Sequence, residues 1–597
     1  MIEQPSSMDA DSSYFIHQCG LKQRNIVNND GYCALFIVNT PAVDDSGVGH
    51  AVEHFVFRRS KAFNDTSTLF QLTSLTDLTI NASTCSRVTY FHCQSQCQDT
   101  FELGLRYLLS GLLKPLFCDS DLTNEIHDGA NCGVIFRELS GSTLDDIAQR
   151  QSQIDKSDTS SERTHQYGGD SRFISKLTTD DIKKYHAQHY QPTTISLVTA
   201  NVSTSLVSTL LEPIIFDNDG ETVVEAQHNY RPMQQQFPLE FERGKLLARW
   251  WLSPTYFDYF ESHYSRLSGL LLPINAELTP PQLNLNKNGQ FALNVIVNDK
   301  NTELLSAILK QFIIDNLPPK YSTVVKLEKL HQRKYSPAIN RLLEVHYANQ
   351  SELAQPSRLS IGVPTLHDLT TIEPQNIREN IVQKTLLKRV SQRLLEPLVE
   401  LSNKIKQRNM RPSSPANNKP RTFAMPKLLN SLYLEAIVQL ADVVEHLNYN
   451  DAQLKGVAVA VDQSHCVVVT QLVGENFALA TLASYIIGAY PPFLAPRTQG
   501  HCYLTAAIYL ETSHHLVIFS ALDVTPMFRL DTIRQSLSLL SKDANFIAKS
   551  LELAKIKYCD MYRKIISETN DISPTTVAEF LQKLSDGIIK VSNGIVR

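Results

Sequence analysis

Residues 50–54 read His-Ala-Val-Glu-His, and these five positions combine residue types that could perform metal-assisted hydrolysis. On a helix, His50 and His54 lie one turn apart on the same face, a spacing that lets two imidazoles bind one zinc ion. Glu53 lies beside them, where its carboxylate could take a proton from a zinc-bound water. A catalytic zinc site needs three protein ligands and one open position, so the pattern predicts a third ligand elsewhere in the chain.

The residues around the pentapeptide favour a buried helix. Gly47 and Gly49 precede it and indicate a turn just before the helix begins. Apolar side chains at helical spacing could bury its faces, namely Ala51, Val52, Phe55 and Val56. The alternative is a surface helix that carries this pattern by chance, since the chain has 18 histidines. The pentapeptide alone is therefore a hypothesis about function.

Four further segments follow the pentapeptide. The candidate third ligand is Glu138, in the stretch GVIFRELSG at 133–141. Residues 78–90 (LTINASTCSRVTY) lie between, and residues 167–170 (YGGD) and 178–192 (TTDDIKKYHAQHYQP) come after. In this order the segments resemble the pitrilysin/insulinase family of zinc peptidases, whose H-x-x-E-H motif inverts the common order. The resemblance is greatest to the presequence-protease branch, in a shortened form, and covers about residues 30–200.

The resemblance implies roles for individual residues. Glu138 would be the third zinc ligand, with one zinc per chain. Asn81 and Ala82 would belong to an edge strand to which an extended peptide substrate adds as a further β-strand. The stretch from Arg497 to Tyr503 resembles the arginine and tyrosine that the C-terminal half of these enzymes sends into the active site.

The chain also departs from the family pattern. Arg58, Arg59 and Ser60 stand where close relatives have a glycine followed by Ser or Thr. Some branches carry a second acidic residue seven positions before the third ligand, and this chain has Asn131 there. Asn131 cannot supply a carboxylate to orient a ligand, and Glu125 is a hypothetical replacement. Relatives of the presequence-protease type are much longer than this chain, and the length that it lacks falls in the second and third family domains. The family encloses its substrate in a chamber between two halves, and this departure puts such a chamber in question.

These features together predict a zinc metalloendopeptidase that hydrolyses short or unfolded peptides. Glu53 would act as general base and later protonate the leaving amine. Arg497 and Tyr503 would donate hydrogen bonds to the substrate carbonyl or the developing oxyanion. Two alternatives stay open: a non-catalytic scaffold or subunit of the same fold, and a dedicated maturation protease for one partner peptide.

Composition excludes several other classes of function. The 597-residue chain is 42% hydrophobic and 20% charged, a composition typical of a globular protein. Its net charge of -5 does not indicate a basic surface that would bind nucleic acid. It has no apolar run of about 18 residues, so it predicts no membrane span. Its acidic, polar N-terminus resembles neither a signal nor a transit peptide, so we expect a cytoplasmic protein, either a monomer or a homodimer. The ten cysteines form no C-x-x-C pair, and free thiols are a simpler interpretation than a second zinc site at Cys93 and Cys97.

Strand and helix signals mix without strict alternation, which favours α+β layers. The resemblance implies an α+β fold class of mixed or antiparallel sheets covered by helices, arranged as two halves around a central active-site cavity. We expect a catalytic domain at 1–225, a reduced second domain at 235–350, a helical segment with a proline-rich linker at 351–426, and a C-terminal domain at 427–597. The predicted strands are 33–38, 88–93, 246–252, 289–297, 456–461, 466–472 and 515–521. The predicted helices are 100–113, 256–272, 302–317, 364–408 and 476–490.

Overall fold

The chain divides into two units of α and β structure in the computed structural model, and each is described separately. The first unit contains residues 1–142, 158–233 and 379–597, and the second contains 143–157 and 234–378. The structure describes residues 12–27, 31–85, 87–140, 167–215, 230–233, 245–252, 270–271, 282–285, 291–298, 304, 307–308, 336–347, 365–368, 394–401, 456–462, 465–472, 477–510, 514–562, 569 and 571–589.

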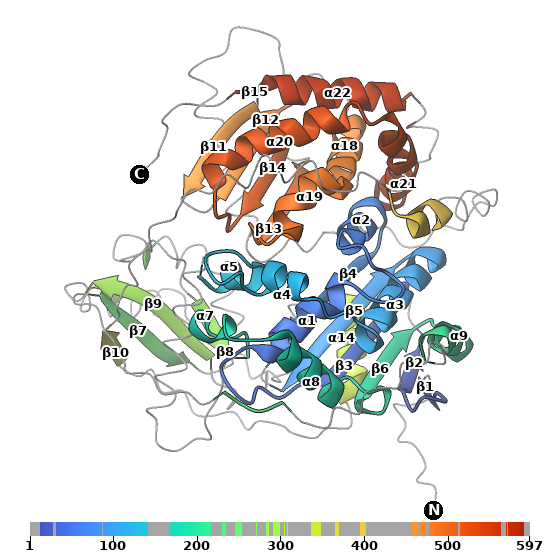
Figure 1. The fold of residues 1–597 in the computed structure, drawn as a ribbon, viewed down its shortest axis with the longest axis vertical. Helices are drawn as coiled ribbons and strands as arrows, with labels where there is room; N and C mark the ends of the chain where they lie inside the picture. The colour runs from blue at the N-terminus through green and yellow to red at the C-terminus, as the bar shows by residue number, and fades with distance from the viewer. Residues whose placement is uncertain are drawn as a thin grey trace, which may run out of the picture. The chain divides into compact units, whose positions relative to one another are not determined.

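A six-stranded sheet is the framework of the N-terminal part of the first unit (Figure 1). Its strands, in spatial order, are β1 (Ser12–Ile16), β2 (Lys22–Ile26), β6 (Ile195–Ala200), β3 (Tyr32–Asn39), β5 (Val88–Ser95) and β4 (Thr79–Thr84). β2 and β6 pair in parallel, and the other neighbours pair antiparallel. The apolar run of β3 is buried along almost its whole length, whereas β4 forms an edge of the sheet.

Helix α1 (Val48–Arg58) carries the pentapeptide and packs against α3 (Gln98–Leu113), α8 (Thr179–His189) and β4. The helix begins after Gly47, whose φ of 70° is in the left-handed region that favours glycine. Gly49, expected from the sequence to precede the helix, lies in its first turn. Its apolar face, including Val52 and Phe55, is fully buried. The other helices of this part are α2 (Thr68–Leu75), α4 (Asp119–Glu125), α5 (Val134–Ser140), α7 (Ser171–Ile174), η1 (Pro192–Thr194) and α9 (Thr204–Ile215).

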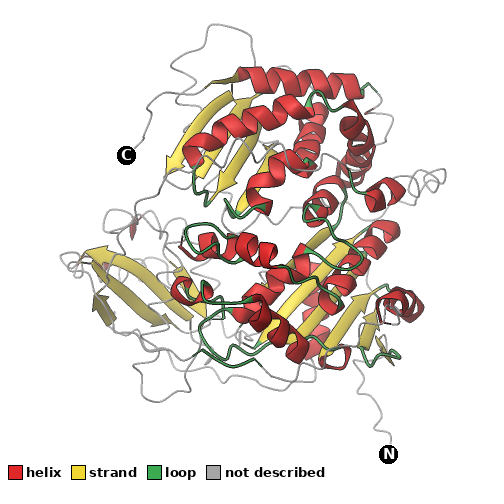
Figure 2. Cartoon of the chain, in the orientation of Figure 1, coloured by secondary structure: helices red, strands yellow, loops and turns green. Residues whose placement is uncertain are grey.

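The C-terminal part of the first unit is a five-stranded sheet with helices packed on it (Figure 2). In spatial order its strands are β13 (Leu504–Leu510), β14 (His515–Ala521), β12 (His465–Gln471), β11 (Gly456–Asp462) and β15 (Ile588–Ile589). Its helices are α18 (Phe477–Ala489), α19 (Pro491–Thr498), α20 (Pro526–Leu540), α21 (Ala544–Tyr562) and α22 (Pro574–Gly587). α18 and α21 also contact α2, so the N- and C-terminal parts share one packed core.

The second unit contains a four-stranded antiparallel sheet. In spatial order its strands are β10 (Thr365–Asp368), β7 (Lys245–Leu252), β9 (Phe291–Asn298) and β8 (Gln282–Leu285). The described part of this unit also contains helix α14 (Pro337–Tyr347).

The α+β fold class is confirmed, and all seven predicted strands match observed ones to within a few residues. The helices predicted at 100–113 and 476–490 are α3 and α18. The helix predicted over 364–408 is wrong at Thr365–Asp368, which pairs with β7 as strand β10. The local pattern of apolar residues does not predict this strand, because it depends on pairing with β7, which is distant in the sequence. Most of that helix, and nearly all of those at 256–272 and 302–317, lie outside the described residues.

Within the described ranges, no single helix is both long and apolar enough to cross a bilayer. The bent pair α18 and α19 reaches that length and composition only when its two helices are counted together.

Candidate metal centre and active site

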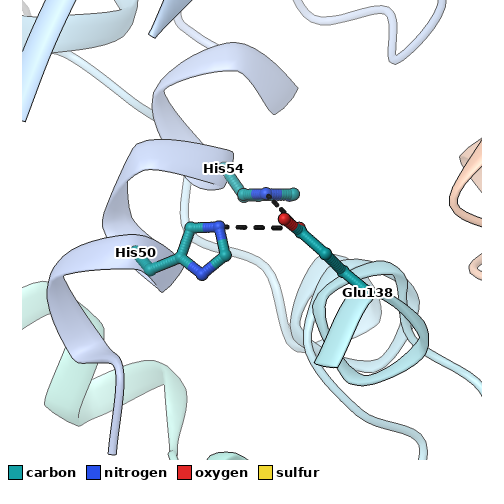
Figure 3. Close-up of side chains that lie close together, drawn as sticks. All are labelled: His50, His54 and Glu138. Atoms are coloured by element: carbon teal, nitrogen blue, oxygen red, sulfur yellow. Dashed lines mark ion pairs between the residues drawn. The ribbon is translucent and has the colours of Figure 1, made fainter. Parts of the chain in front are cut away.

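Three side chains from two helices converge on one point (Figure 3). α1 presents His50 and His54 from successive turns, with their ring centroids 5.0 Å apart. Glu138 reaches them from α5. Its Oε2 lies 3.6 Å from Nε2 of His50 and 3.9 Å from Nε2 of His54. The three potential ligand atoms all lie within 4.8 Å of one another, which is the spacing of ligands around a single ion.

Hydrogen bonds on the far side of each ring orient the two imidazoles. Nδ1 of His50 lies 2.9 Å from the carbonyl oxygen of Gly168, and Nδ1 of His54 lies 3.0 Å from Oε2 of Glu125. Each Nδ1 therefore carries the proton that it donates, and Nε2, on the side of Glu138, is the ring nitrogen that can bind a metal ion. Metal-binding histidines are oriented in this way by carbonyl and carboxylate acceptors.

The residues present fit a catalytic zinc ion. Oε2 of Glu138 is buried and has no hydrogen-bond partner among the described residues, so an atom that should not be left unsatisfied points into the cluster. Two imidazole nitrogens and one carboxylate oxygen form the donor set of catalytic zinc sites, which leave the fourth position open. No other group of at least three His, Cys, Asp or Glu side chains in the described part of the chain has this geometry, and Cys93 and Cys97 join none.

The glycines around α1 allow a close approach of two chain segments. A Cβ on Gly47 would lie 2.6 Å from Cα of Gly169, a distance that real structures do not show. Gly169 also has a positive φ, of 94°. Two glycine backbones therefore touch at the start of α1, and this contact brings the Gly168 carbonyl to His50.

Nearby charges shift the pKa of His50, in the cluster, and of Glu125, beside it. Burial disfavours the charged imidazole, but the carboxylates of Glu138 and Glu53 outweigh it and raise the pKa of His50. Burial also opposes ionisation of Glu125, but Arg497, Arg58 and His54 hold the pKa of that carboxyl well below its usual range. Glu125 is therefore an ionised carboxylate next to a candidate ligand.

Glu53 lies between the cluster and the edge strand β4. The hydroxyl of Thr84, the last residue of β4, donates a hydrogen bond to Oε2 of Glu53. On the same strand, Asn81 is exposed and Ala82 is half-buried. The Ala82 amide donates to the side-chain oxygen of Asn81 at 2.9 Å, so a side-chain acceptor can reach this backbone donor. Glu53 and the strand expected to bind substrate are thus in direct contact.

Arg497 and Tyr503 both reach this region from the C-terminal part. Arg497, near the end of α19, donates from Nη1 to Oε1 of Glu125 at 2.9 Å, and its guanidinium lies 5.5 Å from the ring centroid of Phe70. Tyr503 precedes β13, and the charge of Glu138, together with burial, raises the pKa of its hydroxyl. Tyr503 therefore stays protonated at neutral pH and can act as a hydrogen-bond donor.

Sequence reasoning missed several contributors. Arg58 appeared only as a departure from the family pattern, yet it is buried and donates to Glu125 at 2.7 Å and to Asp121 at 2.9 Å. Thr84 and the Gly168 carbonyl were not singled out, because nothing in their local sequence marks a contact with α1. Glu125, the hypothetical replacement for an acidic residue at position 131, does contact His54.

Comparison with known proteins gives partial matches. No family model matches the chain. The mitochondrial presequence protease of Gibberella zeae is 27% identical over 188 residues, which cover 29% of this chain and 18% of that protein. An uncharacterized protein of Schizosaccharomyces pombe is 25% identical over 169 residues, covering 27% of this chain and 16% of that protein. An uncharacterized protein of Saccharomyces cerevisiae is 25% identical over 240 residues, which cover 36% of this chain and 23% of that protein. The matches therefore span less than a quarter of the length of these relatives.

Solved structures show a looser similarity. An inactive domain of peptidase M16 from Pseudomonas fluorescens has 13% identity and a TM-score of 0.36, and covers 56% of this chain and 87% of that chain. The ferredoxin protease FusC, in complex with Arabidopsis ferredoxin, has 12% identity and a TM-score of 0.31. The match covers 97% of this chain and 74% of FusC. These neighbours are peptidase-like, but scores this low support no conclusion about activity.

Proposed function

We propose that this chain is a zinc metallopeptidase of the pitrilysin/insulinase type that hydrolyses bonds within short or unfolded peptides. The observation that carries the proposal is the convergence of His50, His54 and Glu138, with both Nε2 atoms facing a buried carboxylate oxygen that has no hydrogen-bond partner among the described residues. Glu53 on the same helix supplies the carboxylate that hydrolysis also needs. The partial sequence match to a presequence protease supports this assignment.

A zinc ion held by these ligands would polarise the peptide carbonyl and lower the pKa of a water to about 7. Glu53 would take a proton from the water that attacks the carbonyl carbon. As the carbon–nitrogen bond breaks, Glu53 would deliver that proton to the leaving amine. The Thr84 hydroxyl would hold the Glu53 carboxylate in place through its hydrogen bond. Tyr503 would donate to the carbonyl oxygen as negative charge develops there.

The edge strand β4 supports a substrate that binds in an extended conformation. One side of β4 pairs with β5, and no strand in the described part of the chain pairs with its other side. An extended peptide could add there by backbone hydrogen bonds near Asn81 and Ala82, which would demand little of the peptide's sequence. Such binding would favour unfolded peptides over folded proteins. A cytoplasmic location and a monomeric or homodimeric state remain predictions.

The experiment that tests this function compares wild type with Glu53→Gln. Elemental analysis should find about one zinc per chain in both proteins, because Glu53 is not a ligand in this assignment. The variant should cleave a library of unstructured peptides at least about 100-fold more slowly, the size of a general-base contribution. Glu212→Gln, the same substitution at an exposed position of α9, is the matched control and should cleave normally.

Each alternative has its own outcome. A wild-type protein that binds no zinc, or binds zinc but cleaves nothing, would favour the non-catalytic scaffold. Cleavage of only one peptide in the library would favour a dedicated maturation protease. A Glu53→Gln protein as active as wild type would show that Glu53 is not the base.

A further inference from the structure

Glu125 links the candidate metal helix to the C-terminal part of the same unit. Its Oε2 accepts the hydrogen bond from Nδ1 of His54 at 3.0 Å. Its Oε1 accepts from Nη1 of Arg58 at 2.7 Å and from Nη1 of Arg497 at 2.9 Å. The Glu125 side chain is 4% exposed, so these three contacts replace its solvation. One carboxylate therefore contacts a candidate zinc ligand with one oxygen and two guanidinium groups with the other.

The contact between these parts continues beside Glu125. Nη2 of Arg58 donates to the carbonyl oxygen of Thr498 at 2.5 Å, and the amide of Gly133 donates to the carbonyl oxygen of Gly500 at 2.9 Å. A Cβ on Gly500 would lie 2.3 Å from the carbonyl oxygen of Asn124, so the two backbones are closely packed. Residues 497–500 thus fit against the chain on both sides of the loop that leads to the third candidate ligand.

Arg497 has a different neighbour from the one that its expected role requires. As a donor to substrate it would aim its guanidinium at the reacting carbonyl, but its Nη1 donates to Glu125. The resulting chain of contacts runs from Arg497 through Glu125 to His54, with each link at 3.0 Å or less. Arg497 itself is largely buried, its side chain 13% exposed.

We propose that Arg497 is a positioning residue for the metal site: it fixes Glu125, which fixes His54, so docking of residues 497–500 sets the affinity for zinc. This inference rests on the proposed zinc site. Removing a partner that orients a metal ligand typically weakens metal binding by about 10–100-fold. Because Arg58 would still hold Oε1 of Glu125, loss of Arg497 should weaken zinc binding by about 10-fold, the lower end of that range.

The experiment measures zinc affinity by competition with a chromophoric chelator, using the full chain. The proteins are wild type, Arg497→Gln, Glu125→Gln and the double variant. Arg497→Gln alone should bind zinc about 10-fold more weakly. In the Glu125→Gln background the same substitution should have little further effect, because residues that act through a shared partner are not additive. Arg497→Lys, which keeps the charge, serves if the Gln variant does not fold, and should recover part of the affinity.

Lys557→Met is the matched control. Lys557 is another buried cation of the C-terminal part, and its Nζ donates to the carbonyl oxygens of Thr73 and Ser74 at 2.9 Å each. It has no link to His54 among the described contacts, so this variant should keep its zinc affinity within about twofold, as expected of independent sites. An equal loss of affinity in Lys557→Met would overturn the inference, because general loosening of the two parts would then explain the result.

Two other outcomes separate this inference from the proposed function. If Arg497→Gln binds zinc like wild type and only its KM for peptides rises, Arg497 is a substrate donor and the inference is wrong, while the zinc peptidase assignment stands. If wild type binds no zinc, the proposed function fails and the inference fails with it.

Discussion

A single methyl group added at Gly111 should disturb helix α1, which carries the candidate ligands His50 and His54. Gly111 lies on α3, where a Cβ would come within 2.2 Å of the carbonyl oxygen of Val56 on α1. Real Cβ atoms essentially never approach closer than 3.0 Å, so the two helices would have to separate by 0.8 Å or more. The obstacle is backbone, which cannot turn away as a side chain can. Val56 is two positions beyond His54, so the shift would reach the candidate ligands.

The free-energy balance favours destabilisation. Forcing extra volume into a packed contact costs about 1–3 kcal/mol. Alanine in place of glycine in a helix interior returns about 1 kcal/mol. We therefore expect Gly111→Ala to unfold at lower temperature, with a net loss of up to about 2 kcal/mol, the difference between these terms. Zinc affinity should fall as well, because ligands must be held close to their productive geometry.

The control for this prediction is Gly104→Ala on the same helix. A Cβ there would meet the end of the Leu78 side chain, 2.5 Å from Cδ1, and a leucine side chain can adjust where a backbone carbonyl cannot. Thermal unfolding and chelator competition on both variants should show a clear loss for Gly111→Ala and a smaller change for Gly104→Ala. Equal stability and equal zinc affinity in the two variants would refute the reasoning.

Two further predictions concern a hydroxyl and a buried cation. Thr84→Val removes the donor to Glu53, so peptide cleavage should slow by at least about tenfold while zinc content stays the same, since a hydrogen bond to a charged group contributes about 1.5–3 kcal/mol. Unchanged steady-state cleavage would contradict this role for Thr84. Burial lowers the pKa of Lys557 from 10.5 to about 7, so between these values the unfolded chain binds more protons than the folded one. Stability relative to Lys557→Met should then rise with pH above 7 by up to about 1.4 kcal/mol per unit, and denaturant midpoints that differ by a constant amount from pH 7 to 10 would disprove it.

Sequence reasoning worked best where a pattern is local. The H-x-x-E-H spacing places His50 and His54 on one face of α1 because helix geometry fixes the separation of positions i and i+4. Long apolar stretches such as that of β3 likewise predict buried strands. Glu138 is different, since its place opposite the histidines came from a family resemblance. No periodicity in the chain relates position 138 to position 50.

Glu125 was a hypothetical orienting carboxylate and does contact His54, but the other groups that orient the candidate ligands could not be predicted, for a physical reason. The acceptor for His50 is a backbone carbonyl at Gly168, which any residue would supply, so the side chain leaves no signal there. Arg58 and Arg497 are ordinary cations in sequence, and only the fold brings both to one oxygen of Glu125. Contacts of this kind depend on which segments pack together, and that packing is a property of the whole core.

Arg58 is the other guanidinium that contacts Glu125, and its burial has a physical explanation. A buried guanidinium is costly unless its donors are paired, and here Asp121, Glu125 and the Thr498 carbonyl pair them. A glycine at position 58 would remove the guanidinium that donates to Asp121 and Glu125. Of the two guanidinium groups described at Glu125, that of Arg497 would then remain. Arg58 and Glu125 therefore belong to one arrangement, in which two cations from distant parts of the chain hold the acceptor of a candidate zinc ligand.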